Sequence, residues 1–123
     1  MIPATPGGPQ PHDYIKDFEA LYPDLASNFL TLQAQQYNLF ARKMISYGIE
    51  NIALGTSLED PEDRSVSLIG IIIRVLDKVN RLKNLILKKR SNPISDESIR
   101  DTWMDLANYS LIYLLVDMKL WKK

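Results

Sequence analysis

The chain has 123 residues, of which 46% are hydrophobic and 24% charged, and its 15 basic and 15 acidic side chains cancel to a formal net charge of zero. This length and composition predict one globular domain with a single core, and the balanced charge argues against a general attraction to nucleic acid or to a membrane surface. The absence of cysteine excludes disulfides and cysteine zinc sites, and a single histidine, His12, argues against a histidine-based metal site.

Residues 1–12 are rich in proline and glycine, and we expect them to form a flexible arm outside a single domain over residues 13–123. The arm lacks the basic-then-apolar pattern of a secretory signal. The longest apolar run, residues 68–73, is too short to cross a bilayer. These features predict a cytoplasmic protein with no membrane partner.

Two helices are expected in the first half of the chain. A short one covers residues 13–21 and ends before Pro23, because the residue preceding a proline disfavours helical geometry. A longer one covers residues 27–48, where apolar side chains recur at helical spacing. Residues 49–60 read as a connector with a single helical turn.

Two longer helices are expected in the second half. Asp60 and Pro61 predict the start of the first, because a capping carboxylate followed by proline suits an opening turn, and the helix should end near Lys89. After the break at Pro93, a final helix is expected over residues 96–120. The loop between these helices is short, so they should form a long antiparallel hairpin. No segment alternates with the period of a strand, so the predicted fold class is an all-α helical bundle of about four helices.

Each of these two helices carries a polar stripe, because residues three or four apart share one helix face. The first stripe is mainly cationic and the second mainly acidic. If the stripes face one another, they form either a row of ion pairs, each contributing about 0–1 kcal/mol when exposed, or a cleft for a charged ligand. The first stripe consists of Gly70, Arg74, Asp77, Lys78, Arg81 and Asn84, and the second of Glu97, Asp101, Asp105 and Asn108.

Two kinds of ligand suit these stripes. Arginine and lysine side chains three or four residues apart can clamp a phosphate group. Carboxylates at the same spacing can hold a hard cation such as Mg²⁺, which is a candidate cofactor although the pattern requires none. No catalytic residue can be assigned, since the chain has neither a Walker-type loop nor a Ser/His/Asp set. The candidate metal ligands are Asp77, Glu97, Asp101 and Asp105.

The last part of the final helix is apolar on almost every side beyond Asn108, which is typical of a buried helix or of a contact between subunits. We therefore expect a homo-oligomer. The aromatic residues Trp103, Tyr109 and Tyr113 are expected to pack mainly in the core, with Tyr109 also a candidate to stack on a ligand.

Three segments, residues 39–48, 70–85 and 97–112, resemble the nucleotide modification associated domain 1 family, whose members are small proteins found largely in bacteriophages. The shared features are a Lys before Tyr-Gly, then Arg-x-x-Asp-Lys-x-x-Arg-Leu, then Glu-Ser-x-x-Asp-Thr-x-x-Asp-Leu-x-Asn-Tyr. The resemblance implies a link to nucleotides. The matching positions are Lys43, Tyr47, Gly48, Arg74, Asp77, Lys78, Arg81, Leu82, Glu97, Ser98, Asp101, Thr102, Asp105, Leu106, Asn108 and Tyr109.

The last of these motifs is also similar, more remotely, to the MazG-type all-α nucleotide pyrophosphatases. Those enzymes hold magnesium with a Glu-x-x-Glu pair on one helix and a Glu-x-x-Asp pair on the next. Where the first acidic pair would be expected, this chain has three cations and one carboxylate, namely Arg74, Asp77, Lys78 and Arg81. The exchange removes metal ligands and adds partners for phosphate, which favours binding over hydrolysis.

Three functions fit these observations. The first is a non-catalytic protein that binds a phosphorylated or cyclic nucleotide, in a phage setting as an anti-defence protein that sequesters a host immune signal. The second is a Mg-dependent nucleoside triphosphate pyrophosphohydrolase, and the third is a protein-interaction module that docks through its apolar final helix. No direct binding to DNA is expected. The candidate ligand-binding residues are Lys43, Tyr47, Arg74, Lys78, Arg81, Asp105, Asn108 and Tyr109.

Overall fold

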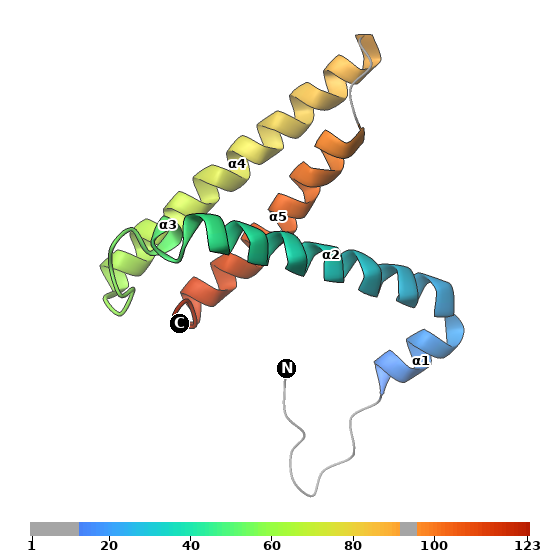
Figure 1. The fold of residues 1–123 in the computed structure, drawn as a ribbon, viewed down its shortest axis with the longest axis horizontal. Helices are drawn as coiled ribbons and strands as arrows, with labels where there is room; N and C mark the ends of the chain where they lie inside the picture. The colour runs from blue at the N-terminus through green and yellow to red at the C-terminus, as the bar shows by residue number, and fades with distance from the viewer. Residues whose placement is uncertain (1–12, 92–95) are drawn as a thin grey trace, which may run out of the picture. The chain divides into compact units, whose positions relative to one another are not determined.

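A computed structural model describes residues 13–91 and 96–123 of the chain, and the side chains of residues 13–88 and 98–123. The described residues form five helices, four of them with seven or more residues, and no strand, which confirms the predicted all-α class (Figure 1). The proposed arm, residues 1–12, lies outside the described residues. Over the described ranges, no helix is long and apolar enough to span a membrane. The helices are α1 Tyr14–Leu21, α2 Pro23–Tyr47, α3 Glu50–Ala53, α4 Pro61–Ser91 and α5 Asp96–Asp117.

The chain divides within α2 into two compact units, the first ending at Gln35 and the second beginning at Gln36. In the first unit, the carboxylate of Asp13 accepts a hydrogen bond of 3.0 Å from the backbone N–H of Lys16 and so caps α1. That residues 13–123 form one domain remains a prediction.

Helix α2 begins at Pro23, four residues before its predicted start. Proline suits the first turn of a helix because that turn leaves its N–H groups without intrahelical partners. The predicted end is confirmed, since α2 stops at Tyr47. The following Gly48 adopts a φ of 74°, which a residue without a Cβ accommodates easily, and its N–H donates to the carbonyl of Met44 at 2.8 Å.

Helices α4 and α5 pack against one another and run antiparallel, which confirms the predicted hairpin (Figure 1). The start of α4 is also as predicted, because the carboxylate of Asp60 accepts the backbone N–H of Glu62 at 2.8 Å. Helix α5 ends at Asp117, three residues earlier than predicted. Lys119 takes a left-handed φ of 61°, and the next N–H, of Leu120, donates to the carbonyl of Leu115 at 2.7 Å, which closes the helix.

The core of the second unit lies where α3, the first half of α4 and the end of α5 meet. Two hydrogen bonds tie these elements together: Ser67 Oγ donates to the carbonyl of Ile52 at 2.7 Å, and Trp121 Nε1 donates to the carbonyl of Ile49 at 3.1 Å. Helix α3 therefore has a fixed position beside α4. The buried residues of this core are Ile52, Ala53, Leu58, Ile71, Ile112, Val116 and Trp121.

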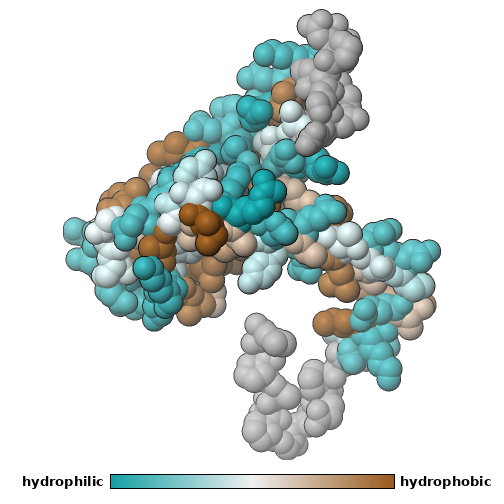
Figure 2. Space-filling model, viewed as in Figure 1, coloured by the Kyte–Doolittle hydropathy of each residue, from teal (hydrophilic) through white to brown (hydrophobic). Residues whose placement is uncertain are grey.

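Several large apolar side chains of the second unit remain on its surface, and Figure 2 shows hydrophobic surface over the first half of α4. On α4, the aliphatic side chains of Ile72 and Leu76 are 45% and 57% exposed. The expectation that Trp103 lies in the core is wrong, because this side chain is 57% exposed. Tyr109 and Tyr113 do pack, partly buried, against the core.

Candidate functional site

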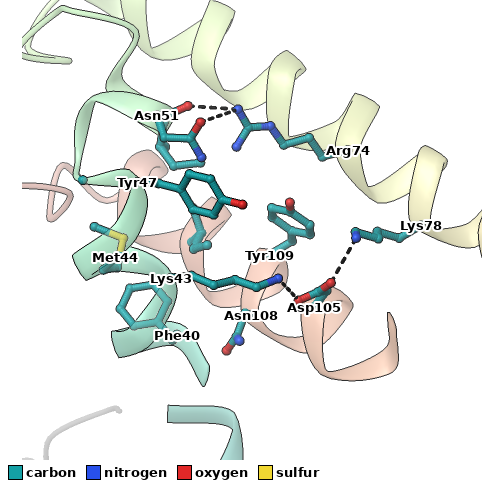
Figure 3. A pocket seen from close by; sticks show the side chains of 13 residues that line it. Phe40, Lys43, Met44, Tyr47, Asn51, Arg74, Lys78, Asp105, Asn108 and Tyr109 are labelled. Carbon is teal, nitrogen blue, oxygen red and sulfur yellow. Dashed lines mark hydrogen bonds and ion pairs between the residues drawn. The ribbon is translucent and has the colours of Figure 1, made fainter. Parts of the chain in front are cut away.

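A single pocket of about 360 Å³ in the second unit contains most of the residues singled out in the sequence (Figure 3). The C-terminal part of α2 and the elements α3, α4 and α5 all contribute to its lining. Arg81, by contrast, is exposed on α4 and does not line the pocket. Seven of the eight candidate ligand-binding residues lie in the lining, namely Lys43, Tyr47, Arg74, Lys78, Asp105, Asn108 and Tyr109.

Asp105 is the centre of an ionic cluster at one end of this pocket. Lys43 on α2 donates to its Oδ1, and Lys78 on α4 lies 3.0 Å from its Oδ2, so one carboxylate joins three helices. The Asp105 side chain is only 11% exposed, whereas those of Lys43 and Lys78 are 44% and 29% exposed. The two ammonium groups are therefore held close together while remaining open to a solute in the pocket.

The environment of Asp105 keeps this carboxyl group ionised. Burial by itself raises the pKa of Asp105, because it penalises the charged form. Hydrogen bonds and positive charge from Lys43 and Lys78 outweigh that effect, so the pKa of Asp105 lies below its ordinary value. At neutral pH the cluster therefore carries two positive charges and one negative charge.

Arg74 enters the pocket from α4, one helical turn before Lys78, and turns its guanidinium group toward α3 (Figure 3). Its Nη2 donates to the backbone carbonyl of Asn51 at 2.9 Å and to the side-chain Oδ1 of the same residue at 3.4 Å. Both acceptors are uncharged, so these bonds orient the guanidinium group without cancelling its charge. A guanidinium group has five N–H donors, which leaves others for an anion.

Two tyrosines lie between these cationic groups. In Figure 3 the hydroxyl ends of Tyr47 and Tyr109 are directed into the pocket, between Arg74 and Asp105. Tyr47 is 65% exposed and so keeps an open ring face, whereas Tyr109 is partly buried against the core. Open aromatic faces and phenol groups of this kind can contact a base or a ribose.

Asn108 holds the opposite wall of the pocket in place. Its side chain is buried, and its Nδ2 donates to the backbone carbonyl of Gln36 at 3.4 Å, which connects α5 to α2. On the same wall the ring of Phe40 meets the indole of Trp121 edge-on, with centroids 6.1 Å apart. The polar groups of the pocket are therefore mounted on a packed apolar base.

The candidate metal ligands are dispersed over the two helices. Asp77 and Asp101 are exposed and lie outside the pocket lining, and Asp105 is engaged by two lysines. The side chain of Glu97 lies outside the described residues. Within the described part of the chain, no group of three or more His, Cys, Asp or Glu side chains is arranged to hold a metal ion. The Mg²⁺ site therefore remains a prediction.

Six further residues line the pocket that the sequence did not single out for ligand binding. Asn51 of α3 is the most consequential, because it orients Arg74. In the sequence it falls in the expected connector over residues 49–60, where no periodic pattern marks a position. The apolar members of the lining resemble ordinary core positions in the sequence. These six residues are Phe40, Met44, Gly48, Asn51, Ile52 and Ile112.

A comparison with known protein families matches residues 55–116, half of the chain, to the family described as nucleotide modification associated domain 1. The chain belongs to this family. The matched segment includes Arg74, Lys78 and Asp105, whereas Lys43 and Tyr47 on α2 lie before it. The nucleotide modification associated domain 1 name associates these proteins with nucleotide modification. Searches of curated proteins and of solved structures each found no match.

Proposed function

We propose that this protein binds a phosphorylated nucleotide in the pocket around Asp105 and carries out no reaction on it. The observation that supports this best is the gathering of Lys43, Lys78 and Arg74 in one pocket that also presents Tyr47. Ammonium and guanidinium groups bind phosphate, and an aromatic face binds a base or ribose. The family name, which associates these proteins with nucleotides, agrees with this ligand class.

The state of Asp105 favours binding over metal-dependent hydrolysis. Both of its oxygens already interact with ammonium groups, and a Mg²⁺ ion would have to displace them to reach the carboxylate. Hydrolysis of a phosphoanhydride on a metal centre also needs several oxygen ligands around one point. The exposed positions of Asp77 and Asp101, outside the pocket lining, do not provide them.

Sequestration is the biological role that suits a binding protein of this kind. A small phage protein that holds a host nucleotide signal, including a cyclic one, lowers the free concentration of that signal without modifying it. The open pocket and the partly exposed lysine side chains are compatible with direct capture from solution.

Calorimetry with a panel of nucleotides tests the binding proposal. The panel contains nucleoside mono-, di- and triphosphates and cyclic mono- and dinucleotides, titrated into the wild-type protein, Lys78→Ala and Lys83→Ala. We expect micromolar binding of at least one nucleotide to the wild type, weakened about 10- to 100-fold in Lys78→Ala because a phosphate contact is lost.

Lys83→Ala is the matched control, since Lys83 is exposed on the same helix and does not line the pocket. Its affinity should stay within about twofold of the wild type. Thermal unfolding followed by circular dichroism confirms that each variant is folded. The proposal is wrong if no nucleotide produces heat, or if the two variants bind equally well. Conversion of a bound triphosphate, detected by chromatography after the titration, would instead support hydrolysis.

We also propose that two copies of this chain associate through an apolar groove between α4 and α5. The groove is lined by Ile71, Ile72, Val75, Leu76, Tyr109, Ser110, Tyr113 and Leu114. Ile72, Leu76 and Leu114 in this lining are each about half exposed in the single chain. A second copy that covers these side chains would gain about 25 cal/mol for each Å² of apolar surface removed from water.

A further inference from the structure

The charged groups that line the pocket fall into two separate sets. At one end, two lysines share the single carboxylate of Asp105, which leaves one net positive charge. At the other end, Arg74 is bonded to the neutral acceptors of Asn51 and contributes a second net positive charge. In Figure 3 the two sets point to different parts of the pocket, with the hydroxyl groups of Tyr47 and Tyr109 between them.

The hydrogen bonds hold the two sets apart. The lysine ammonium groups are fixed on either oxygen of a carboxylate that is itself buried on α5. The guanidinium group of Arg74 is fixed on Asn51 of α3. Ser67 bonds to the carbonyl of Ile52 in this helix, and Trp121 bonds to the carbonyl of Ile49 just before it. Bringing both sets onto one phosphate group would disturb these bonds.

From this charge separation we infer that the ligand carries two phosphate charges on opposite sides of a nucleoside, and that these charges are not adjacent in one polyphosphate chain. The inference rests on the proposed function and specifies its ligand. One phosphate meets Lys43 and Lys78, the other meets Arg74, and the nucleoside lies against the tyrosines. Because each set has one net positive charge, two separated phosphate groups match the pocket better than a single highly charged tail.

Two classes of nucleotide have this chemistry. One is a nucleoside with phosphates on both its 3′ and 5′ oxygens. The other is a cyclic dinucleotide, whose two phosphodiester groups are separated by nucleosides and carry one negative charge each. A volume of about 360 Å³ lies toward the small end of ligand pockets, which are typically about 300–1,000 Å³. The pocket therefore accommodates one nucleoside, and the second base of a cyclic dinucleotide would extend into solvent.

The decisive comparison is between ligands that have the same number of phosphates in different places. For each of the four common ribonucleosides, calorimetry compares the 5′-monophosphate, the 5′-diphosphate and the 3′,5′-bisphosphate, together with the symmetric cyclic dinucleotide. We expect the bisphosphate or the cyclic dinucleotide of at least one base to bind at least about tenfold more tightly than the matching 5′-diphosphate. Whichever of the bisphosphate and the cyclic dinucleotide binds more tightly identifies which of the two nucleotide classes the pocket takes.

The variant Arg74→Gln sharpens the test. In this variant the two-phosphate ligand should bind no more than about threefold more tightly than the 5′-monophosphate, because only the lysine set still binds phosphate. The control Arg42→Gln changes an exposed arginine of α2 that does not line the pocket. It should prefer the two-phosphate ligand over the 5′-monophosphate as strongly as the wild type does.

Two outcomes overturn the inference while leaving nucleotide binding intact. Either the 5′-diphosphates bind as tightly as the separated isomers for every base, or Arg74→Gln weakens monophosphates and two-phosphate ligands by the same factor. If no ligand of the series and no other nucleotide binds, the proposed function fails together with the inference. Unfolding curves of both variants verify that each retains its fold.

Discussion

Helices α4 and α5 present two contrasting surfaces, a charged pocket and an apolar groove. In the pocket, Lys43 of α2 and Lys78 of α4 contact the carboxylate of Asp105, and Arg74 donates to Asn51. The groove is lined mainly by aliphatic side chains such as Leu76 and Leu114, which have no directional requirement. Tyr109 lines both surfaces, so one residue of α5 connects them.

This contrast separates two kinds of recognition. Directed charges select a small ligand by the position of its phosphates, because an ion pair depends strongly on distance and orientation. Aliphatic surface selects a partner by shape and area, and it is suited to another protein surface. We therefore propose the pocket as the site for a nucleotide and the groove as the site for a second copy. The variants below change one surface at a time, and the measured effect is on self-association, nucleotide affinity or stability.

The largest expected effect is on self-association. In the double variant Leu76→Lys/Leu114→Lys, two charges enter the groove, and burying them against a second copy becomes unfavourable. We expect the dissociation constant for self-association, measured by analytical ultracentrifugation, to rise at least about 100-fold while nucleotide affinity stays within about twofold.

Leu87→Lys provides the matched control for this variant. Leu87 and Leu76 are both 57% exposed, but Leu87 lies outside the groove. If Leu87→Lys weakens self-association as strongly as the double variant does, the interface is not confined to the groove and includes another part of α4. A wild-type protein that sediments as a monomer at high concentration would remove the self-association proposal, and nucleotide binding would be unaffected.

An intermediate effect is expected for stability when the centre of the pocket loses its charge. In Asp105→Asn, the ammonium groups of Lys43 and Lys78 lose their shared carboxylate, and an amide N–H₂ group faces one of them. We expect the free energy of unfolding, measured by urea denaturation, to fall by roughly 1–3 kcal/mol. Asp101→Asn, one turn earlier on α5 and exposed, should change it by less than about 0.5 kcal/mol. Equal effects in both variants would show that the cluster does not stabilise the fold.

The smallest expected effect is on the loss of folding stability at acidic pH. Because the pKa of Asp105 is lowered in the folded protein, its ionised form stabilises the fold at every pH above the ordinary value near 3.8. This contribution is lost as the pH falls below that value and through the folded pKa, since the unfolded chain then binds the proton more tightly. Urea unfolding at a series of acidic pH values should show a steeper loss of stability for the wild type than for Asp105→Asn. Parallel curves would contradict the lowered pKa.

Local chemistry accounts for the parts of the fold that were predicted correctly. Asp60 and Pro61 define the start of α4, and Gly48 follows the end of α2, because capping and left-handed geometry depend on only a few neighbouring residues. The early start of α2 at Pro23 and the early end of α5 at Asp117 are small errors at helix ends, where several residues satisfy the same rules.

The candidate site was predictable only in part. Helical spacing and the family motif singled out Arg74, Lys78 and Asp105, which do line one pocket. Asn51 has no such signal, because its role depends on a bond to a residue 23 positions away in the chain. Trp103 was assigned to the core from its residue type, yet it lies on the exposed side of α5.

By itself, the sequence determined the helices, the hairpin of α4 and α5, and the residue types available for binding phosphate. These properties follow from interactions over one or two helical turns, which a linear pattern records. Only the tertiary structure decided which carboxylate pairs with which cations, how Arg74 is turned, and which half of the apolar surface stays exposed. Those outcomes depend on how the C-terminal part of α2 and the element α3 pack against the hairpin, a long-range arrangement that no local spacing encodes.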